Sequence, residues 1–162
     1  VTIRPFNTFG PRQYARAVIP TIITQLASGY SVKLGALDPT RDFTYVSDTV
    51  DGLIAGLNAP KEALGQVINL GTGFDISVRD TAHLIADVMG KPIRIAEDAQ
   101  RLRPQKSEVE RLLSDNAKAK RLLDWSPKLA GKDGLREGLA RSTEWFLAPA
   151  NLARYRADAY NI

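Results

Sequence analysis

The feature that most restricts the fold of this chain is the alternation of short apolar runs with stripes of apolar residues at helical spacing. Runs of strand length occupy residues 1–3, 31–35, 42–45, 66–70 and 93–95. Between and after them, apolar residues recur every three to four positions, which is the period of a helix with one buried face. Strands that alternate with helices predict an α/β fold, with helices outnumbering strands towards the C-terminus.

Four stripes predict helices, and turn and cap residues bound them. The stripes are Val18, Ile19, Ile22, Ile23 and Leu26; Val46, Val50, Leu53, Ile54 and Leu57; Val78, Ala82, Ile85 and Met89; and Leu135, Leu139, Ser142 and Phe146. Gly29 suits a helix C-terminus, Ser47 or Asp48 is expected to cap the second helix, and Ser77 the third. Residues 7–13 predict a turn-rich loop, and residues 97–116 a long one.

Length and composition place the chain among ordinary globular domains. Its 162 residues are enough for one buried core, and 44% of them are apolar. The absence of cysteine excludes disulfides, a thiolate nucleophile and a zinc–thiolate site, and a single histidine argues against a histidine-rich metal site. With no membrane-length apolar run and no recognisable signal peptide, we expect a cytoplasmic protein that does not enter membranes.

The net charge of +4 is unevenly distributed along the chain. Residues 1–41 and 101–121 each carry +4, whereas residues 42–100 carry −5 and residues 122–162 carry +1. A nucleic-acid-binding protein usually shows one broader basic surface. Two short basic segments around an acidic middle favour a compact anionic ligand, and we expect no nucleic-acid partner.

The sequence Gly71-Thr72-Gly73 allows two interpretations. It is similar to the start of a dinucleotide-binding loop, but Ile76 replaces the third glycine and the expected acidic position falls near Pro92. A tight strand-to-helix turn that requires glycine is the stronger interpretation. Asn69, an amide in an otherwise apolar strand, needs partners when buried, and a ligand at the mouth of a sheet is one source of them.

Arginines carry the clearest chemical signal, because other catalytic patterns are missing. No tyrosine is followed at the fourth position by lysine, no serine–histidine pairing is recognisable, and His83 falls off its helix stripe as a surface residue. Arg4, Arg41 and Arg103 lie at predicted strand ends or in loops. A guanidinium group can bind two phosphate oxygens at once, although for each arginine alone a surface ion pair is the simpler interpretation.

Five motifs in series resemble the C-terminal half of the extended short-chain dehydrogenase/reductases, the nucleotide-sugar epimerases, dehydratases and decarboxylases. They are Arg4-Pro5-Phe6-Asn7-Thr8-Phe9-Gly10-Pro11-Arg12, Val18-Ile19-Pro20, Thr40-Arg41-Asp42-Phe43-Thr44-Tyr45-Val46-Ser47-Asp48, Ile68-Asn69-Leu70-Gly71 and Arg103-Pro104. Residues 101–120 and the terminal Tyr160-Asn161-Ile162 look most like UDP-N-acetylglucosamine 4,6-dehydratases of legionaminic-acid-type pathways. The stretch Asn7 to Arg12 is also similar to UDP-glucuronate decarboxylases.

The resemblance implies that residues 1–162 form a single substrate-binding lobe, comprising the last core strand of an extended Rossmann fold and a helix-rich part. It further implies an N-terminal Rossmann half before Val1, with the glycine-rich NAD loop, the Tyr-x-x-x-Lys pair and the helices of a homodimer. The complete enzyme would use NAD to remove water from UDP-N-acetylglucosamine or a similar UDP-hexose. The alternatives are a UDP-glucuronate decarboxylase, a UDP-sugar 4-epimerase, or a binding module that lost catalysis.

The resemblance also assigns roles to individual residues. Pro5 matches the position against the nicotinamide ring. The UDP-sugar positions are Asn7 on the diphosphate, Val18 and Leu34 near the nucleotide and its base, Arg41 and Arg103 on the nucleoside diphosphate, and Asn69 near the phosphates. No catalytic residue and no metal ligand is assigned within the chain, and Arg12 and Arg16 receive no defined role.

Overall fold

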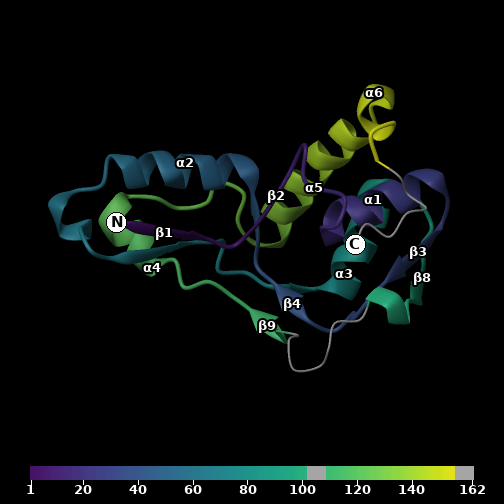
Figure 1. The fold of residues 1–162 in the computed structure, drawn as a ribbon, viewed down its shortest axis with the longest axis horizontal. Helices are drawn as coiled ribbons and strands as arrows, with labels where there is room; N and C mark the ends of the chain where they lie inside the picture. Colours follow the sequence, from purple (N-terminus) through teal and green to yellow (C-terminus); the bar gives the residue numbers. More distant parts are fainter. Residues whose placement is uncertain (102–108, 156–162) are drawn as a thin grey trace.

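The computed structural model describes residues 1–101 and 109–155, which form short, mostly parallel strand pairs covered by helices (Figure 1). The strands are β1 (Thr2–Pro5), β2 (Asn7–Phe9), β3 (Ser31–Leu34), β4 (Thr40–Arg41), β5 (Phe43–Tyr45), β6 (Val67–Leu70), β7 (Ile76–Ser77), β8 (Arg94–Glu97) and β9 (Arg111–Leu112). The α-helices are α1 (Val18–Ser28), α2 (Val46–Leu57), α3 (Val78–Val88), α4 (Ala117–Leu123), α5 (Gly131–Leu147) and α6 (Pro149–Leu152). Two 3-10 turns, η1 (Lys61–Ala63) and η2 (Ala99–Arg101), complete the described elements.

The strands of the described residues pair in four small sheets. β1 pairs with β6, β2 with β5 and β3 with β8, and each of these pairs is parallel. β4 lies between antiparallel β7 and parallel β9. Parallel neighbours need long crossover connections, and helices supply them here. The predicted α/β class is therefore confirmed.

The larger of two hydrophobic clusters lies among α1, α3 and α5. Ile22 and Ile23 of α1, Ile85 of α3 and Leu139 of α5 are all fully buried in it. The predicted stripes of these three helices therefore face the core. Gly29 is the C-cap residue of α1, as predicted.

The second cluster lies at the other end of the molecule, where α4 contacts the β1–β6 pair (Figure 1). Ile68 and Leu70 of β6 are fully buried there, and Trp125 donates its ring N–H to the Asp48 carbonyl oxygen at 3.1 Å. This bond fixes the indole beneath α2. The strand predicted over residues 66–70 is β6, so that prediction is confirmed.

Helix α2 packs mainly with its small residues, and of its apolar stripe only Val46, the first residue of the helix, packs against the larger core. Its buried residues are Asp48, Thr49, Gly52 and Gly56. A Cβ atom on Gly52 would lie 2.5 Å from a Leu70 methyl carbon, so only glycine permits this close approach to β6. The stripe residues Val50, Leu53, Ile54 and Leu57 are exposed by 44–87%.

Local predictions have mixed outcomes. Ser77 caps α3 by accepting a hydrogen bond from the Asp80 N–H, as predicted. The cap expected at Ser47 or Asp48 is wrong, because Tyr45 is the N-cap residue of α2 and makes no side-chain cap bond. The loop predicted over residues 7–13 begins with a strand instead, since β2 finds a parallel partner in β5.

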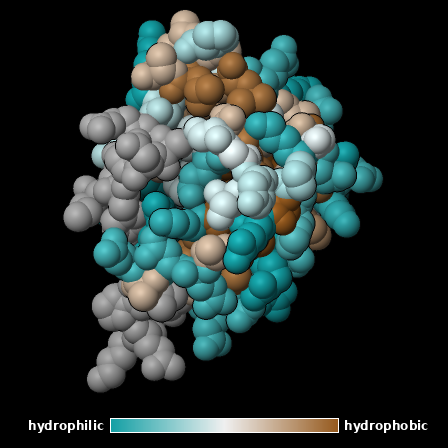
Figure 2. All heavy atoms as spheres, turned by 90° about the vertical axis from the view of Figure 1, so that its right-hand side faces the viewer, coloured by the Kyte–Doolittle hydropathy of each residue, from teal (hydrophilic) through white to brown (hydrophobic). Residues whose placement is uncertain are grey.

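The end of the molecule distant from α2 shows mostly hydrophilic atoms, with hydrophobic atoms gathered mainly in its upper part (Figure 2). His83 is exposed, as predicted for a surface histidine.

Within residues 1–101 and 109–155, the helices are too short or too polar to cross a membrane. The same residues contain no cluster of three histidine, cysteine or acidic side chains suited to a metal ion.

Candidate functional site

A cavity of about 570 Å³ opens between β2, the start of α1, the end of β3 and β4. Asn7 and Arg41 line it from two strands, Val18 from the first residue of α1, and Leu34 from the last residue of β3. These four residues are separated by up to 34 positions in the sequence, and the fold places them around one space. Their individual roles stay predictions.

The lining of this cavity is cationic. Arg16, Arg41 and Arg101 border it, and its described lining contains no aspartate or glutamate. Arg101 also forms an ion pair with Asp98, with the Nε atom 3.2 Å from a carboxylate oxygen. Arginine binds planar anions through paired N–H groups, so the lining suits an anionic ligand such as a phosphate ester.

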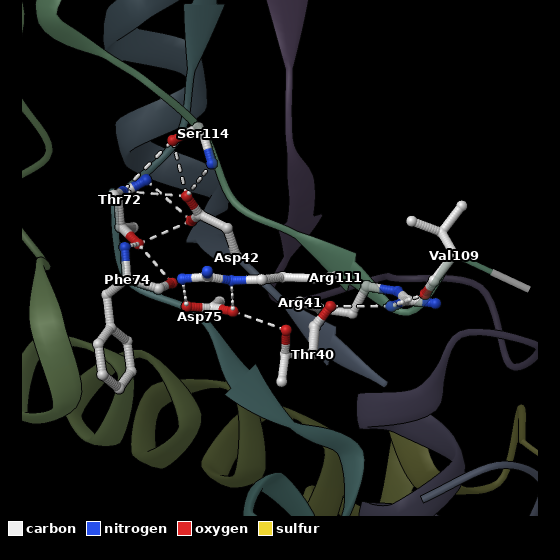
Figure 3. A network of polar contacts seen from close by, with 10 residues as sticks. Thr40, Arg41, Asp42, Thr72, Phe74, Asp75, Val109, Arg111 and Ser114 are labelled. Carbon is white, nitrogen blue, oxygen red and sulfur yellow. Dashed lines mark hydrogen bonds and ion pairs between the residues drawn. The ribbon is translucent and has the colours of Figure 1, made fainter. Parts of the chain in front are cut away.

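Strand β4 and its neighbour β9 hold Arg41 in place. The Arg41 Nη1 atom donates to the carbonyl oxygens of Thr40 at 2.8 Å and Val109 at 2.7 Å (Figure 3). The Thr40 N–H donates to the Glu110 carbonyl oxygen at 2.8 Å, which continues the β4–β9 pairing. The orientation of the guanidinium group therefore depends on the position of residues 109–114, which comprise β9 and the residues on either side of it and are called the β9 segment below.

Two amide side chains in the cavity wall have a buried polar atom without a hydrogen-bond partner among the described residues. These atoms are Nδ2 of Asn7 and Oε1 of Gln13. The Gln13 Nε2 atom donates to the Thr8 carbonyl oxygen at 2.9 Å, which fixes the orientation of that amide. A buried polar atom without a partner costs free energy, and a bound ligand is one way to satisfy it.

The wall beside Leu34 depends on a glycine. A Cβ atom on Gly35 would lie 2.4 Å from the Arg101 carbonyl oxygen, so the backbone of η2 packs directly on this residue. The Asp98 N–H also donates to the Leu34 carbonyl oxygen at 2.7 Å. These contacts bring Arg101 to the cavity.

Two of the predicted binding residues do not line this cavity. Pro5 is an exposed residue of β1 opposite Leu70, and Asn69 lies in β6 opposite Arg4. The Asn69 amide donates to the Asp115 carbonyl oxygen at 3.3 Å, so it has a partner within the chain. Arg103 lies outside the described residues. The roles assigned to all three by resemblance stay predictions.

The backbone N–H groups of the Gly71-Thr72-Gly73 turn bind a side chain of the protein itself. The Asp42 carboxylate accepts hydrogen bonds from the N–H groups of Thr72 and Gly73, both at 2.9 Å (Figure 3). In a dinucleotide-binding loop these groups would face the pyrophosphate. The interpretation as a structural turn therefore holds, and the cofactor interpretation of this turn does not.

A second carboxylate in the same region forms an ion pair with an arginine. Asp75 accepts hydrogen bonds from Arg111 Nε at 2.8 Å and from Thr40 Oγ1 at 2.6 Å. The bond from Arg111, followed by that from Thr40, holds the pKa of Asp75 below its usual value. Asp75 thus ties β9 to the turn before β7.

Sequence reasoning overlooked Gln13 and gave no role to Arg16 or Arg101 at the cavity. Gln13 follows the Gly10-Pro11-Arg12 turn, and its polarity alone does not distinguish it from other loop residues. Arg101 is separated from Arg41 by 60 positions, so no local pattern links them. The uneven charge along the chain was the one sequence signal for the cationic lining, because Arg16, Arg41 and Arg101 belong to the two basic segments.

The chain has many relatives of known activity. The family described as GDP-mannose 4,6 dehydratase matches residues 1–138. A UDP-glucose 4-epimerase of Mycolicibacterium smegmatis is 32% identical over 89% of this chain and 44% of its own length. UDP-glucuronic acid decarboxylase 1 of Xenopus tropicalis is 34% identical over 88% of this chain and 32% of its own length.

Solved structures show the same fold. An epimerase from Methanothermobacter thermautotrophicus is 34% identical, with a TM-score of 0.81 over 95% of this chain and 45% of its own. UDP-glucuronic acid 4-epimerase from Bacillus cereus, in complex with UDP-glucuronic acid and NAD, is 29% identical, with a TM-score of 0.78 over 90% of this chain and 44% of its own.

The chain thus spans less than half the length of these relatives. The matches agree with the resemblance of its motifs to extended short-chain dehydrogenase/reductases, and they cover residues on both sides of the cavity. The relatives are epimerases, decarboxylases and dehydratases of nucleotide sugars. This chain belongs to that NAD-dependent epimerase/dehydratase family, within the extended short-chain dehydrogenase/reductases.

Proposed function

We propose that this chain is the nucleotide-sugar-binding lobe of an NAD-dependent enzyme that modifies a UDP-sugar. The observation that carries the proposal is the cavity lined by Arg16, Arg41 and Arg101, with the Asn7 Nδ2 atom in its wall, for which the described residues offer no hydrogen-bond partner. The complex of the Bacillus cereus epimerase with UDP-glucuronic acid and NAD supports this class of ligand. The residues predicted from motifs and the residues around the cavity overlap at four positions.

The physical requirements of a nucleoside diphosphate fit this cavity. The diphosphate brings two or more negative charges, and a hydrogen bond to a charged group contributes about 1.5–3 kcal/mol net. Arg41 of β4 and Arg16, two residues before α1, both line the cavity, and the start of α1 supplies backbone N–H groups suited to anions. Binding energy gained at the diphosphate would hold the sugar in position for the reaction.

For the reaction itself we propose a 4,6-dehydratase acting on UDP-N-acetylglucosamine or a similar UDP-hexose. The family match to a 4,6 dehydratase and the likeness of residues 101–120 to such enzymes support this choice. A UDP-glucuronate decarboxylase or UDP-sugar 4-epimerase is the alternative within the family, supported by the relatives of those activities.

NAD would be bound mainly by a part of the protein that precedes Val1. The Gly71–Gly73 turn cannot hold its pyrophosphate because the Asp42 carboxylate occupies the backbone N–H groups, and only Pro5 is assigned to the cofactor. When bound, NAD accepts and returns a hydride. This chain's residues contribute binding and orientation of the nucleotide.

The exposed stripe of α2 supports a further Rossmann half. Val50, Leu53, Ile54 and Leu57 form an apolar face beside the β1–β6 pair, where Val67 is also exposed. Such a face is costly in water and suits burial against another sheet or helix. We propose that the N-terminal half covers it and that the complete enzyme is a homodimer through helices of that half.

Calorimetric titration of the full-length protein with UDP tests the binding site. Arg41→Ala and Arg103→Ala should each weaken binding by about an order of magnitude or more, since each removes a charge-assisted contact. Arg136→Ala is the matched control, because Arg136 lies on α5 and pairs with Asp87 at the surface. Wild-type affinity in both test variants would refute the site.

Identification of the product separates the reactions. The full-length protein is incubated with UDP-N-acetylglucosamine, UDP-glucose and UDP-glucuronate, and the products are separated from the substrates by chromatography and identified by mass. Loss of water supports the dehydratase, loss of carbon dioxide the decarboxylase, and an isomer of unchanged mass the epimerase. Tight binding without turnover of any substrate would instead support a non-catalytic binding module.

A further inference from the structure

Asp42 is a fully buried carboxylate that accepts five hydrogen bonds. Its Oδ1 atom accepts from the Thr72 N–H at 2.9 Å and the Thr72 hydroxyl at 2.7 Å. Its Oδ2 atom accepts from the Gly73 N–H at 2.9 Å, the Ser114 N–H at 3.1 Å and the Ser114 hydroxyl at 2.7 Å. A buried charge is tolerated only with such compensation.

These bonds connect three segments that are distant in sequence. Asp42 directly follows β4, Thr72 and Gly73 lie in the turn between β6 and β7, and Ser114 follows β9 (Figure 3). The three strands β7, β4 and β9 form one sheet, and the carboxylate lies where the segments next to them meet. The side chain therefore fixes the ends of the sheet that carries Arg41.

The packing around the carboxylate leaves little room for displacement. A Cβ atom on Gly71 would lie 2.2 Å from the Ser114 hydroxyl and 2.9 Å from Asp42 Oδ2. The Ser114 side chain is 5% exposed and its hydroxyl also accepts from the Gly73 N–H at 3.3 Å. The segment after β9 is thus pressed against the glycine turn and held there by Asp42.

The position of this segment decides where Arg41 points. The Asp42 N–H donates to the Leu112 carbonyl oxygen at 2.8 Å, and the Arg41 guanidinium donates to the Val109 carbonyl oxygen at 2.7 Å. Both acceptors belong to the β9 segment, which the carboxylate secures through Ser114. Releasing Ser114 would loosen the end of this segment, which is otherwise held by its pairing with β4 and by the Arg111–Asp75 contact, and would allow the Val109 carbonyl group that binds Arg41 to shift.

We infer that Asp42 is a positioning residue for the anion-binding cavity, acting through the β9 segment on Arg41. This inference rests on the proposed function, because it assigns Arg41 to the diphosphate. Asp42 does not line the cavity and is not expected to touch the ligand. Its removal should weaken nucleotide binding without removing any cavity charge.

Asn is the informative replacement because it keeps the size of the side chain. One carboxylate oxygen becomes an NH₂ group, which cannot accept and would face N–H or O–H donors. At least two donors among Thr72, Gly73 and Ser114 then lose their acceptor. The β9 segment should shift as a result, while the large core around α1, α3 and α5 stays intact.

The test measures UDP affinity by calorimetry in the full-length protein for Asp42→Asn, Arg41→Ala and the double variant. Asp42→Asn should weaken binding about tenfold, and it should add little once Arg41 is absent, because the effect passes through that side chain. A purely structural defect would lower the melting temperature and would add to the effect of Arg41→Ala. Asp51→Asn is the matched control, since Asp51 forms an exposed ion pair with Lys128.

Ser114→Ala covers the case in which Asp42→Asn does not fold, because it removes one donor and leaves the carboxylate with four. It should weaken UDP binding several-fold and, likewise, only when Arg41 is present. Wild-type affinity in a folded Asp42→Asn protein, or additive losses in the double variant, would overturn the inference. Wild-type affinity of both Arg41→Ala and Arg103→Ala would instead overturn the proposed site, so the two failures are distinguishable.

Discussion

Helices α1 and α2 have equally regular apolar stripes and opposite environments. Ile19, Ile22, Ile23 and Leu26 of α1 are at most 1% exposed, whereas Val50, Leu53, Ile54 and Leu57 of α2 are exposed by 44–87%. Helix α1 packs against α3, α5 and β3, so its stripe lies within the larger core. Helix α2 presents glycines and short polar residues to the strands beneath it.

The difference shows what the spacing of apolar residues in a helix predicts about its surroundings and what it does not. An apolar stripe every three to four residues reports that one helix face avoids water, but not which surface covers it. In α1 the covering surface is part of this chain. In α2 the close approach of Gly52 and Gly56 to β6 and β1 turns the stripe away, towards the side where we propose the Rossmann half.

The largest expected effect comes from truncating a leucine of α1, and the same truncation in α2 is its comparison. Leu26→Ala should lower the free energy of unfolding by about 2–5 kcal/mol, because it leaves a cavity in the core. Leu57→Ala should change it by no more than about 0.5 kcal/mol in the 162-residue chain, since this side chain is 87% exposed. Urea unfolding monitored by circular dichroism measures both values.

Equal losses in the two leucine variants would contradict the comparison. Measuring Leu57→Ala in the full-length protein as well tests whether the proposed N-terminal half covers the stripe of α2. A cost there well above that in the shorter chain would support coverage of α2 by the proposed half. An unchanged small cost would leave the stripe as a solvent-exposed surface and weaken the proposal.

Enlarging the small face of α2 should have an intermediate effect. Gly52→Ala places a methyl group 2.5 Å from a Leu70 methyl carbon, so either the buried Leu70 side chain or α2 must shift, at a cost of about 1–3 kcal/mol. Gly29→Ala is the control, because a Cβ atom there meets nothing within 4 Å. Thermal unfolding of both variants should show a loss for Gly52→Ala alone. Equal melting temperatures would indicate that α2 does not depend on its glycine face.

The fold could be predicted from the sequence where a helix, cap or strand depends only on residues near one another in the chain. The stripes of α1, α3 and α5, the Ser77 cap and strand β6 follow from spacing and residue type, and the structure confirms them. Strand β2 was missed because Asn7 has little strand preference and Gly10-Pro11 marks a turn directly after it, whereas pairing with β5 holds these residues extended. The orientation of α2 depends on Gly52 meeting Leu70, which no local pattern contains.

The candidate site was predictable where a motif carries its residues. Asn7, Val18, Leu34 and Arg41 belong to recognisable segments and converge on the cavity. Gln13 and Arg101 reach it through contacts between distant segments, such as the packing of Gly35 on the Arg101 backbone. The donors of the Asp42 network were equally hidden, because Thr72 and Ser114 lie 30 and 72 positions from Asp42.

The smallest expected effect concerns the polar side of α2. The Lys128 Nζ atom lies 2.7 Å from an Asp51 carboxylate oxygen, and this contact, first as a hydrogen bond and then by charge, raises the pKa of Lys128. A raised pKa in the folded state stabilises the protein below the ordinary lysine value of about 10.4, and this contribution disappears as the pH rises through the higher value. Both side chains are exposed, so the effect is largely screened by water and salt.

Lys128→Ala should therefore lower the melting temperature less than Gly52→Ala does, and the loss should vanish in high salt or at strongly alkaline pH. Lys132→Ala, at an exposed position in α5, is the control. A loss for Lys128→Ala as large as that for Gly52→Ala would mean that α2 is held by its ion pair as much as by its close packing.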